Sequence, residues 1–173
     1  MIRPACFALT LALAPLLAGC PTAVGSTGPS DPALDPEETQ LLYELNSIRE
    51  GAGIGTPMIV CASLNKSASA HSDDMRDKGY LSDMAPDGSD VRSRTCDAGY
   101  KPGCSSTTLM AELVASGVDL GKDAADSWNA SDGGQPVILN PGLVAAGTGR
   151  SLGPDGTTYW TLDMGGQDDA SCH

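Results

Sequence analysis

Two side chains in the middle of the chain have the chemistry and the setting for acid–base work. Glu112 lies in an apolar run, residues 109–114, where a carboxylate needs a partner or a raised pKa. His71 lies on an apolar helical stripe with Cys61, Leu64, Ala68 and Met75, because these positions are spaced three and four residues apart. Both are therefore expected to face the interior. Glu112 is a candidate cavity acid and His71 a candidate ligand or base. The structural interpretations, which we favour, are an acid bonded to loop amides and a core histidine with one hydrogen bond.

Asp83, Asp87 and Asp90 are three acids on one turn-rich segment. Oxygen ligands of this kind can bind calcium, but the spacing and the missing terminal Glu do not fit the twelve-residue calcium loop. We therefore interpret them as solvated turn residues. The chain has no Cys-x-x-Cys pair and only two His, which argues against a structural zinc site. It has no Gly-x-Ser-x-Gly elbow for a serine nucleophile.

The first twenty residues have the features of a secretory signal. Arg3 precedes an apolar run that ends in Leu-Ala-Gly before Cys20, and the run is shorter than the ~20 residues that span a bilayer. Leu-Ala-Gly-Cys resembles a bacterial lipobox, which implies that Cys20 becomes the lipidated N-terminus of the mature protein. Pro21 instead of Asp after it favours the outer membrane, by resemblance to enteric sorting signals. The alternative is an ordinary cleaved signal with an incidental Cys.

The composition fits one exported domain behind a tether. Removal of residues 1–19 leaves 154 residues, with 9 basic against 22 acidic side chains and a net charge of −13. This charge argues against nucleic-acid partners and against electrostatic docking on anionic lipid. Residues 20–34 are predicted to be the lipidated Cys and a flexible tether, since they are rich in Pro, Thr, Gly and Ser. Residues 35–173 are predicted to form the domain.

Four cysteines remain in the predicted domain. An even number in an exported protein predicts two disulfides, with three possible connectivities. Cys96 and Cys104 flank a short turn-rich segment, which favours pairing them. Cys61 then pairs with Cys172 and ties the C-terminus to the middle of the domain.

Hydrophobic periodicity and turn signals predict helices before a hairpin. Asp35 begins a capping box for a first helix that Gly51 ends, a second helix covers 62–78, and a third covers 122–130. Residues 82–106 are expected to be loop. Two strands, 143–150 and 157–164, are joined by a Gly-Pro-Asp-Gly turn. This order predicts an α+β fold with helices covering an antiparallel sheet.

Six segments in register resemble the bacterial branch of the CAP superfamily of cysteine-rich secretory, antigen 5 and pathogenesis-related proteins. They are the Leu-Tyr-Glu-Leu-Asn-Ser-Ile-Arg helix at 42–49, Ser-Ala-His-Ser-Asp-Asp-Met at 69–75, Leu-Ser-Asp-Met-Ala-Pro-Asp-Gly at 81–88, Ala-Glu-Leu-Val-Ala at 111–115, the segment 128–141, and Tyr-Trp at 159–160. The resemblance covers about 38–165. It implies an α-β-α sandwich, in agreement with the predicted element order.

The resemblance also implies a cavity of two His and acidic residues, which hold a metal ion such as zinc in some members. Here Asp83 stands in place of one His and Gly134 in place of the other, while the acid remains at Glu112. Loss of both imidazoles removes the natural zinc ligands. We therefore predict no metal site and no cofactor, with a divalent cation as the alternative.

Three functions remain open. The preferred hypothesis is a non-enzymatic envelope lipoprotein that binds a small ligand, a lipid or an envelope component. The second is a hydrolase on peptide or cell-wall material with His71 as base and Glu112 or Asp83 as its partner. The third is a disulfide-stapled module that binds another envelope protein through surface loops such as 82–106.

Overall fold

A four-stranded sheet between two layers of helices makes up the part of the chain that the computed structural model describes, residues 34–172. The predictions for the signal segment, for Cys20 and for most of the tether lie outside these residues. In chain order the elements are α1 (Pro36–Gly51), β1 (Ile59–Val60), α2 (Ala62–Lys78), α3 (Val91–Ala98), the 3₁₀-helix η1 (Lys101–Cys104), β2 (Met110–Ser116), α4 (Gly121–Asn129), α5 (Gly134–Ile138), β3 (Ala145–Leu152) and β4 (Thr158–Gly165).

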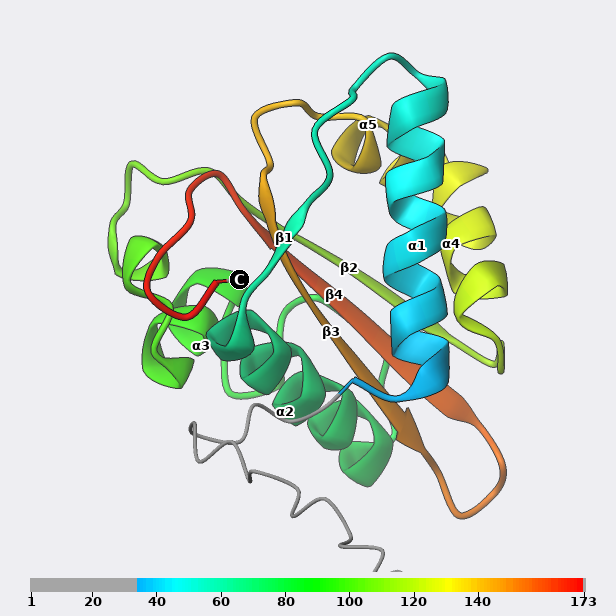
Figure 1. Ribbon diagram of the computed structural model, residues 1–173. Helices are drawn as coiled ribbons and strands as arrows, with labels where there is room; N and C mark the ends of the chain where they lie inside the picture. The colour runs from blue at the N-terminus through cyan, green and yellow to red at the C-terminus, as the bar shows by residue number, and fades with distance from the viewer. Residues whose placement is uncertain (1–33, 173) are drawn as a thin grey trace, which may run out of the picture.

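The sheet has the strand order β1-β3-β4-β2. β1 pairs with β3 in parallel, while β3 with β4 and β4 with β2 pair in antiparallel. Figure 1 shows α1 and α4 on one side of the sheet and α2 and α3 on the other. The predicted α+β fold with an α-β-α arrangement is confirmed.

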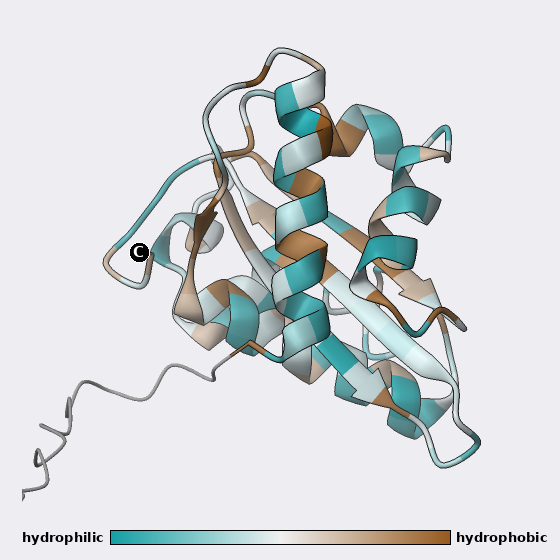
Figure 2. Cartoon of the chain, turned by 45° about the vertical axis from the view of Figure 1, so that its right-hand side comes forward, coloured by the Kyte–Doolittle hydropathy of each residue, from teal (hydrophilic) through white to brown (hydrophobic). Residues whose placement is uncertain are grey.

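The two faces of the sheet differ in chemistry. Towards α1 and α4 lies the main apolar core, to which β4 contributes Trp160, Leu162 and Met164. Apolar residues recur along α1 between hydrophilic ones, as expected for a helix with one buried face (Figure 2). Trp128 belongs to the same core, so both tryptophans of the described residues are core residues.

The face under α2 is polar and closely packed. α2 packs directly against the backbone of β3. A side-chain carbon at Gly147 or Gly149 would come within 2.2 Å of the α2 backbone. Asn65 of α2 accepts a hydrogen bond from the backbone of Thr148. Ser72 donates hydrogen bonds to the Gly149 carbonyl and to Thr161. Polar side chains are thus buried between α2 and the sheet, and this layer contains the site described below.

The helix boundaries follow the local signals in most places. The Asp35 carboxylate accepts from the backbone of Glu38, and the Glu38 carboxylate accepts from the backbone of Asp35, so the predicted capping box is present. α2 covers the predicted range, and Gly79 ends it with a left-handed conformation at φ 68°.

The prediction of loop for residues 82–106 is wrong in its second half. α3 begins after Asp90, whose carboxylate accepts from the backbone of Ser93 while the Ser93 hydroxyl accepts from the backbone of Asp90. Periodicity does not predict this helix, because five of its eight residues are polar and the other three form no apolar stripe. The strand bounds also differ from the prediction by one or two residues at each end.

Both favoured disulfides are present. Cys96 at the end of α3 is bonded to Cys104 in η1, and Cys61 before α2 is bonded to Cys172. The second disulfide closes a separation of 111 residues and holds the C-terminal segment beside the start of α2. Among residues 34–172, no helix has the length and apolar character needed to cross a membrane.

Candidate functional site

Four ionisable side chains from four elements meet in the polar layer under α2. β2 supplies Glu112, β4 supplies Asp163, α2 supplies His71 and α3 supplies Arg94. Glu112 and Asp163 are direct partners across the β2–β4 ladder, so their side chains leave the sheet on the same face. Three of the four side chains are almost fully buried.

Arg94 and Glu112 form a bidentate ion pair. Nη2 of Arg94 lies 2.8 Å and 2.7 Å from the two carboxylate oxygens of Glu112. The exposed fraction is 13% for the Arg94 side chain and 1% for Glu112. Arg94 also donates to the backbone carbonyls of Asp83 and Ser89, at 2.8 Å and 2.6 Å. One guanidinium therefore neutralises the buried acid and fastens the loop that precedes α3.

Asp163 is fully buried, and neither of its carboxyl oxygens has a hydrogen-bond partner among the described residues. Burial raises the pKa of Asp163. Burial also raises the pKa of Glu112, and the neighbouring Asp163 raises it further, while Arg94 and His71 lower it. Two adjacent buried carboxyls retain one proton between them. Because Arg94 stabilises the ionised form of Glu112, we assign that proton to Asp163.

His71 is buried, and its two ring nitrogens have different surroundings. Nε2 lies 2.9 Å from the Ser82 carbonyl and 3.4 Å from Oε1 of Glu112. A carbonyl can only accept, so Nε2 carries the hydrogen. Burial lowers the pKa of His71, and the neutral ring therefore has a lone pair on Nδ1, which has no partner among the described residues.

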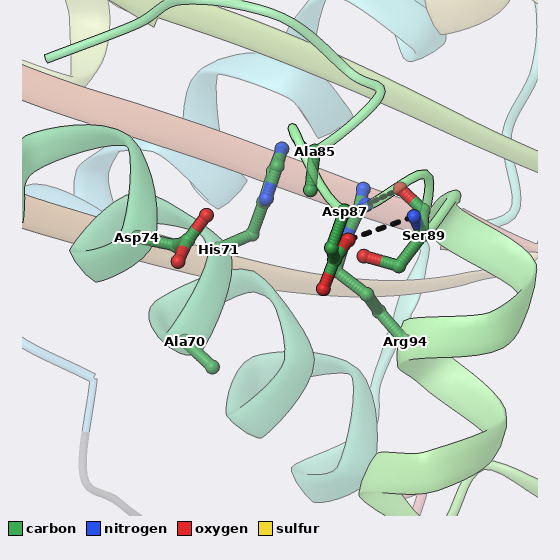
Figure 3. Close-up of a pocket in the computed structure, with 7 residues that line it drawn as sticks. All are labelled: Ala70, His71, Asp74, Ala85, Asp87, Ser89 and Arg94. Atoms are coloured by element: carbon green, nitrogen blue, oxygen red, sulfur yellow. Dashed lines mark hydrogen bonds between the residues drawn. The ribbon is translucent and has the colours of Figure 1, made fainter. Parts of the chain in front are cut away.

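Two adjoining cavities open beside Arg94, between α2, α3 and the loop that joins them. The smaller has a volume of about 190 Å³ and is lined by Ala70, His71, Asp74, Ala85, Asp87, Ser89 and Arg94 (Figure 3). The larger has a volume of about 390 Å³, shares Ala70, Asp87, Ser89 and Arg94 with the smaller, and is also lined by Lys66, Ser67, Asp97 and Ala98. We call the two together the α2–α3 groove.

The structure brings two of the three candidate residues together. Glu112 and His71 are neighbours, whereas the Asp83 side chain is exposed and only its backbone carbonyl contacts Arg94. Glu112 is bonded to Arg94 instead of to loop amides. Asp87 accepts from the backbone of Ser89 and Asp90 caps α3, in keeping with their interpretation as turn residues.

Sequence reasoning missed Arg94 and Asp163. Arg94 lies in a segment that was expected to be loop, although the capping residues Asp90 and Ser93 were a usable signal of a helix there. Asp163 alternates with the core residues Leu162 and Met164, a pattern that predicts a solvent-facing position. That face is covered by α2, which only the tertiary structure reveals.

The residues present do not fit a resident metal ion. The Arg94 guanidinium holds both oxygens of Glu112, which is the remaining acid of the expected cavity. Within residues 34–172, no group of three or more His, Cys, Asp or Glu side chains is arranged to hold a metal ion. We therefore derive no step through a metal.

Comparison with known families agrees with the fold. The model of the CAP cysteine-rich secretory protein family matches residues 42–164, which is most of the chain. This protein belongs to the CAP family. The matched range lies within the segment 38–165 that carries the motifs. No curated protein matches the chain.

Solved structures share the CAP fold with this chain. An outer surface protein from Borrelia burgdorferi has a TM-score of 0.65 at 17% identity, over 78% of this chain and 97% of that one. An extracellular SCP-domain protein from Bacillus anthracis has a TM-score of 0.59 at 22% sequence identity, over 79% of this chain. A cysteine-rich secretory protein from Staphylococcus aureus has a TM-score of 0.56 at 18% sequence identity, over 76% of this chain. The chain covers 44% and 39% of the latter two.

Proposed function

We propose that this protein is an exported lipoprotein, held to the cell envelope by lipidated Cys20, whose CAP domain binds a small ligand in the α2–α3 groove without catalysing a reaction. The ion pair between Arg94 and Glu112 carries the proposal. It neutralises the buried Glu112 and positions Arg94, which is a hydrogen-bonding side chain of the groove wall.

The groove supports binding by its shape and lining. Its larger cavity, about 390 Å³, lies in the range of about 300–1,000 Å³ that is typical of small-ligand sites. Its walls combine the small side chain of Ala70 with polar groups of Ser67, Ser89 and Arg94. A small polar ligand, a lipid headgroup and a segment of an envelope protein are the candidate occupants.

An envelope location is supported by three observations. The N-terminal segment has the features of a lipoprotein signal, and two structural relatives are described as an outer surface protein and an extracellular protein. The two disulfides suit an oxidising compartment. Anchoring at Cys20, and preferentially in the outer membrane, remains our proposal.

Native mass spectrometry of the full chain, exported by a bacterial host and released in mild detergent, tests the binding function. We expect an added mass of a small organic molecule, and we expect it to be absent from Ala70→Leu, which fills the groove from an exposed position. Ala130→Leu, exposed at the end of α4, is the matched control. A bare protein mass in the presence of envelope extract would contradict ligand binding.

Anchoring is tested separately by the mass of the N-terminus. The wild-type chain should begin at Cys20 with attached acyl chains and should fractionate with membranes. A Cys20→Ser chain should carry no acyl chain. An unacylated wild-type protein in the soluble fraction would rule out the anchor while leaving the binding proposal intact.

A hydrolase is the second candidate, and one observation favours it. Nε2 of His71 faces Glu112, and Nδ1 carries a lone pair without a partner among the described residues. The His71 side chain also lines the smaller cavity. This resembles a carboxylate–histidine base. It predicts that His71→Ala lowers the rate on a peptide or wall substrate about 100-fold. An intact exported protein that is inert on both substrate types would remove this candidate.

A further inference from the structure

We propose that the α2–α3 groove binds a short basic peptide, with a backbone amide hydrogen-bonded to His71 and Arg94 and a cationic group beside Asp87 and Asp97. This inference rests on the proposed binding function and names the class of its ligand. It follows from unpartnered polar atoms, from uncompensated charges and from the size of the groove.

One acceptor and one donor in the groove wall have no partner among the described residues. Nδ1 of His71 is the acceptor, and the Nε–H of Arg94 is the donor. An amide group offers the complementary pair, since its N–H donates and its carbonyl accepts. An anion would accept a hydrogen bond from Arg94 but could not donate one to His71. Its own lone pairs would then face the lone pair on Nδ1 of His71. The wall therefore favours an amide over a carboxylate or a phosphate.

A ligand can reach these two nitrogens only if a side chain of the groove moves. Both nitrogens are shielded from water in the free protein. The side chain of Asp87 lines both cavities, is exposed, and is held by one hydrogen bond from the backbone of Ser89. A cationic ligand would draw the Asp87 carboxylate towards itself, and the amide would then reach the wall behind it.

The charges of the groove favour a cation. Arg94 is neutralised by Glu112, and Asp74 is paired with Lys78 at 2.6 Å. The groove residues without an ion pair within the described range are the acids Asp87 and Asp97 and the base Lys66. The remaining charge is negative, and the negative net charge of the whole chain attracts cations over a longer range.

The imidazole signals of the protein report binding directly. The full chain contains two His, so histidine labelled with ¹⁵N gives two imidazole spin systems, and His173→Gln identifies the signal of His71. The exported, detergent-extracted chain would be titrated with acetyl-Ala-Lys-Ala-amide. We expect the free protein to show the Nε2–H tautomer of His71. On titration, the Nδ1 resonance should move in a saturable manner, with a dissociation constant in the millimolar range that is typical of small fragments.

Two probes and two variants separate the parts of the proposal. Acetyl-Ala-Glu-Ala-amide has the amides without the cation, and n-butylamine has the cation without an amide, so both should bind more weakly. Asp97→Asn should lower the affinity for the lysine peptide by up to about fivefold, as expected for loss of an exposed charge pair. Asp132→Asn, at another exposed position, should leave this affinity unchanged. Ala70→Leu should abolish the Nδ1 shift, and Ala130→Leu should preserve it.

Specific results would overturn the inference. They are an Nδ1–H tautomer in the free protein, an Nδ1 resonance that does not respond to the lysine peptide, or equal binding of the lysine and glutamate peptides. If native mass spectrometry still finds an organic ligand that Ala70→Leu removes, the proposed binding function stands and only the assignment to basic peptides fails. If neither experiment detects a ligand, both fail.

Discussion

Asp163 has the most unusual environment of the site residues, because its carboxyl is fully buried and has no hydrogen-bond partner among the described residues. Natural proteins rarely bury such groups unpaired, because each costs about 1–3 kcal/mol. Here the cost is limited by protonation, which makes the group neutral. The neighbouring Glu112 gains from this arrangement, since a neutral Asp163 does not repel it.

Asp163→Asn should therefore stabilise the fold, by about 1–3 kcal/mol at neutral pH. The amide replaces the acid at nearly the same volume and is neutral without taking up a proton on folding. Because burial raises the pKa of Asp163 in the folded state, the folded protein binds this proton more tightly than the unfolded chain. The contribution of this group to wild-type stability is thus greatest at low pH and is lost as the pH rises above 3.8, the ordinary pKa of an Asp side chain.

Urea unfolding of both proteins between pH 4 and 8 measures the effect of this substitution. The Asn variant should show a flatter profile than the wild type over this range. Asp132→Asn, an exposed change, should stay within about 0.5 kcal/mol of the wild type. Destabilisation of Asp163→Asn at pH 7 would show that Asp163 is ionised and paired.

Arg94 holds a buried charge in place, and its removal should be costly. Arg94→Met leaves the ionised Glu112 without its bidentate partner, which we expect to lower the free energy of unfolding by about 3–5 kcal/mol. Arg94→Met combined with Glu112→Gln should recover most of this loss, because no unpaired charge remains. Urea denaturation of the two single variants and the double variant gives the coupling energy, and additive losses would contradict the ion pair.

At the scale of elements, the close approach of α2 to β3 fixes the site. Gly149 lies against the backbone of Ala68, at a point where a side-chain carbon would approach within 2.2 Å. This contact places His71, one turn further along α2, above the carboxyl pair of β2 and β4. The glycines of β3 therefore determine the position of α2, and through α2 they determine the position of His71 in the site.

Gly149→Ala should destabilise the protein by about 1–3 kcal/mol or more, since the added methyl group meets backbone and the helix must move away. Gly55→Ala is the matched control, because a side-chain carbon there would have open space and the residue has no left-handed backbone. Thermal unfolding and the ¹⁵N signals of His71 would report both consequences. Unchanged stability together with an unchanged His71 signal would refute this account of the packing.

Local sequence signals predicted most of these elements. The Asp35 capping box, the apolar stripe of α2 and the Gly-Pro-Asp-Gly turn each predicted an element that is present. α3 has no apolar stripe. It is held instead by a disulfide at Cys96 and by the polar contacts of Arg94. Periodicity is a signal of apolar burial, and it gives no information about a helix that is held by other means.

The candidate site was half predictable for a related reason. An acid inside an apolar run identified Glu112, and a His on an apolar stripe identified His71. Their partners Arg94 and Asp163 lie in surroundings that look solvent-facing in the sequence. They become buried only because α2 and α3 cover the same face of the sheet.

At the scale of the whole molecule, the two disulfides should differ in their contribution to stability. In the chain-entropy model the loss is about 4–5 kcal/mol for a closed loop of about 100 residues and about 3 kcal/mol for one of about 15. The separations here are 111 residues for Cys61–Cys172 and 8 for Cys96–Cys104. Removal of the first by a double Ala substitution should therefore cost more than removal of the second.

Urea unfolding of the two double variants, each exported under oxidising conditions, compares these losses. The Cys96–Cys104 variant should also change the affinity for peptide, because that disulfide anchors the helix that carries Arg94. Equal losses of stability would contradict the ranking by loop length.

Arg94 supplies the positive charge beside Glu112, at the acid for which the family resemblance implied a metal ion in some members. Isothermal titration of the exported, detergent-extracted chain with zinc at pH 7 tests this claim most directly. We predict that the wild-type protein shows no saturable zinc binding that depends on Glu112. Stoichiometric binding in the wild type that is lost in Glu112→Gln would show that the ion pair yields to metal, and it would contradict the account.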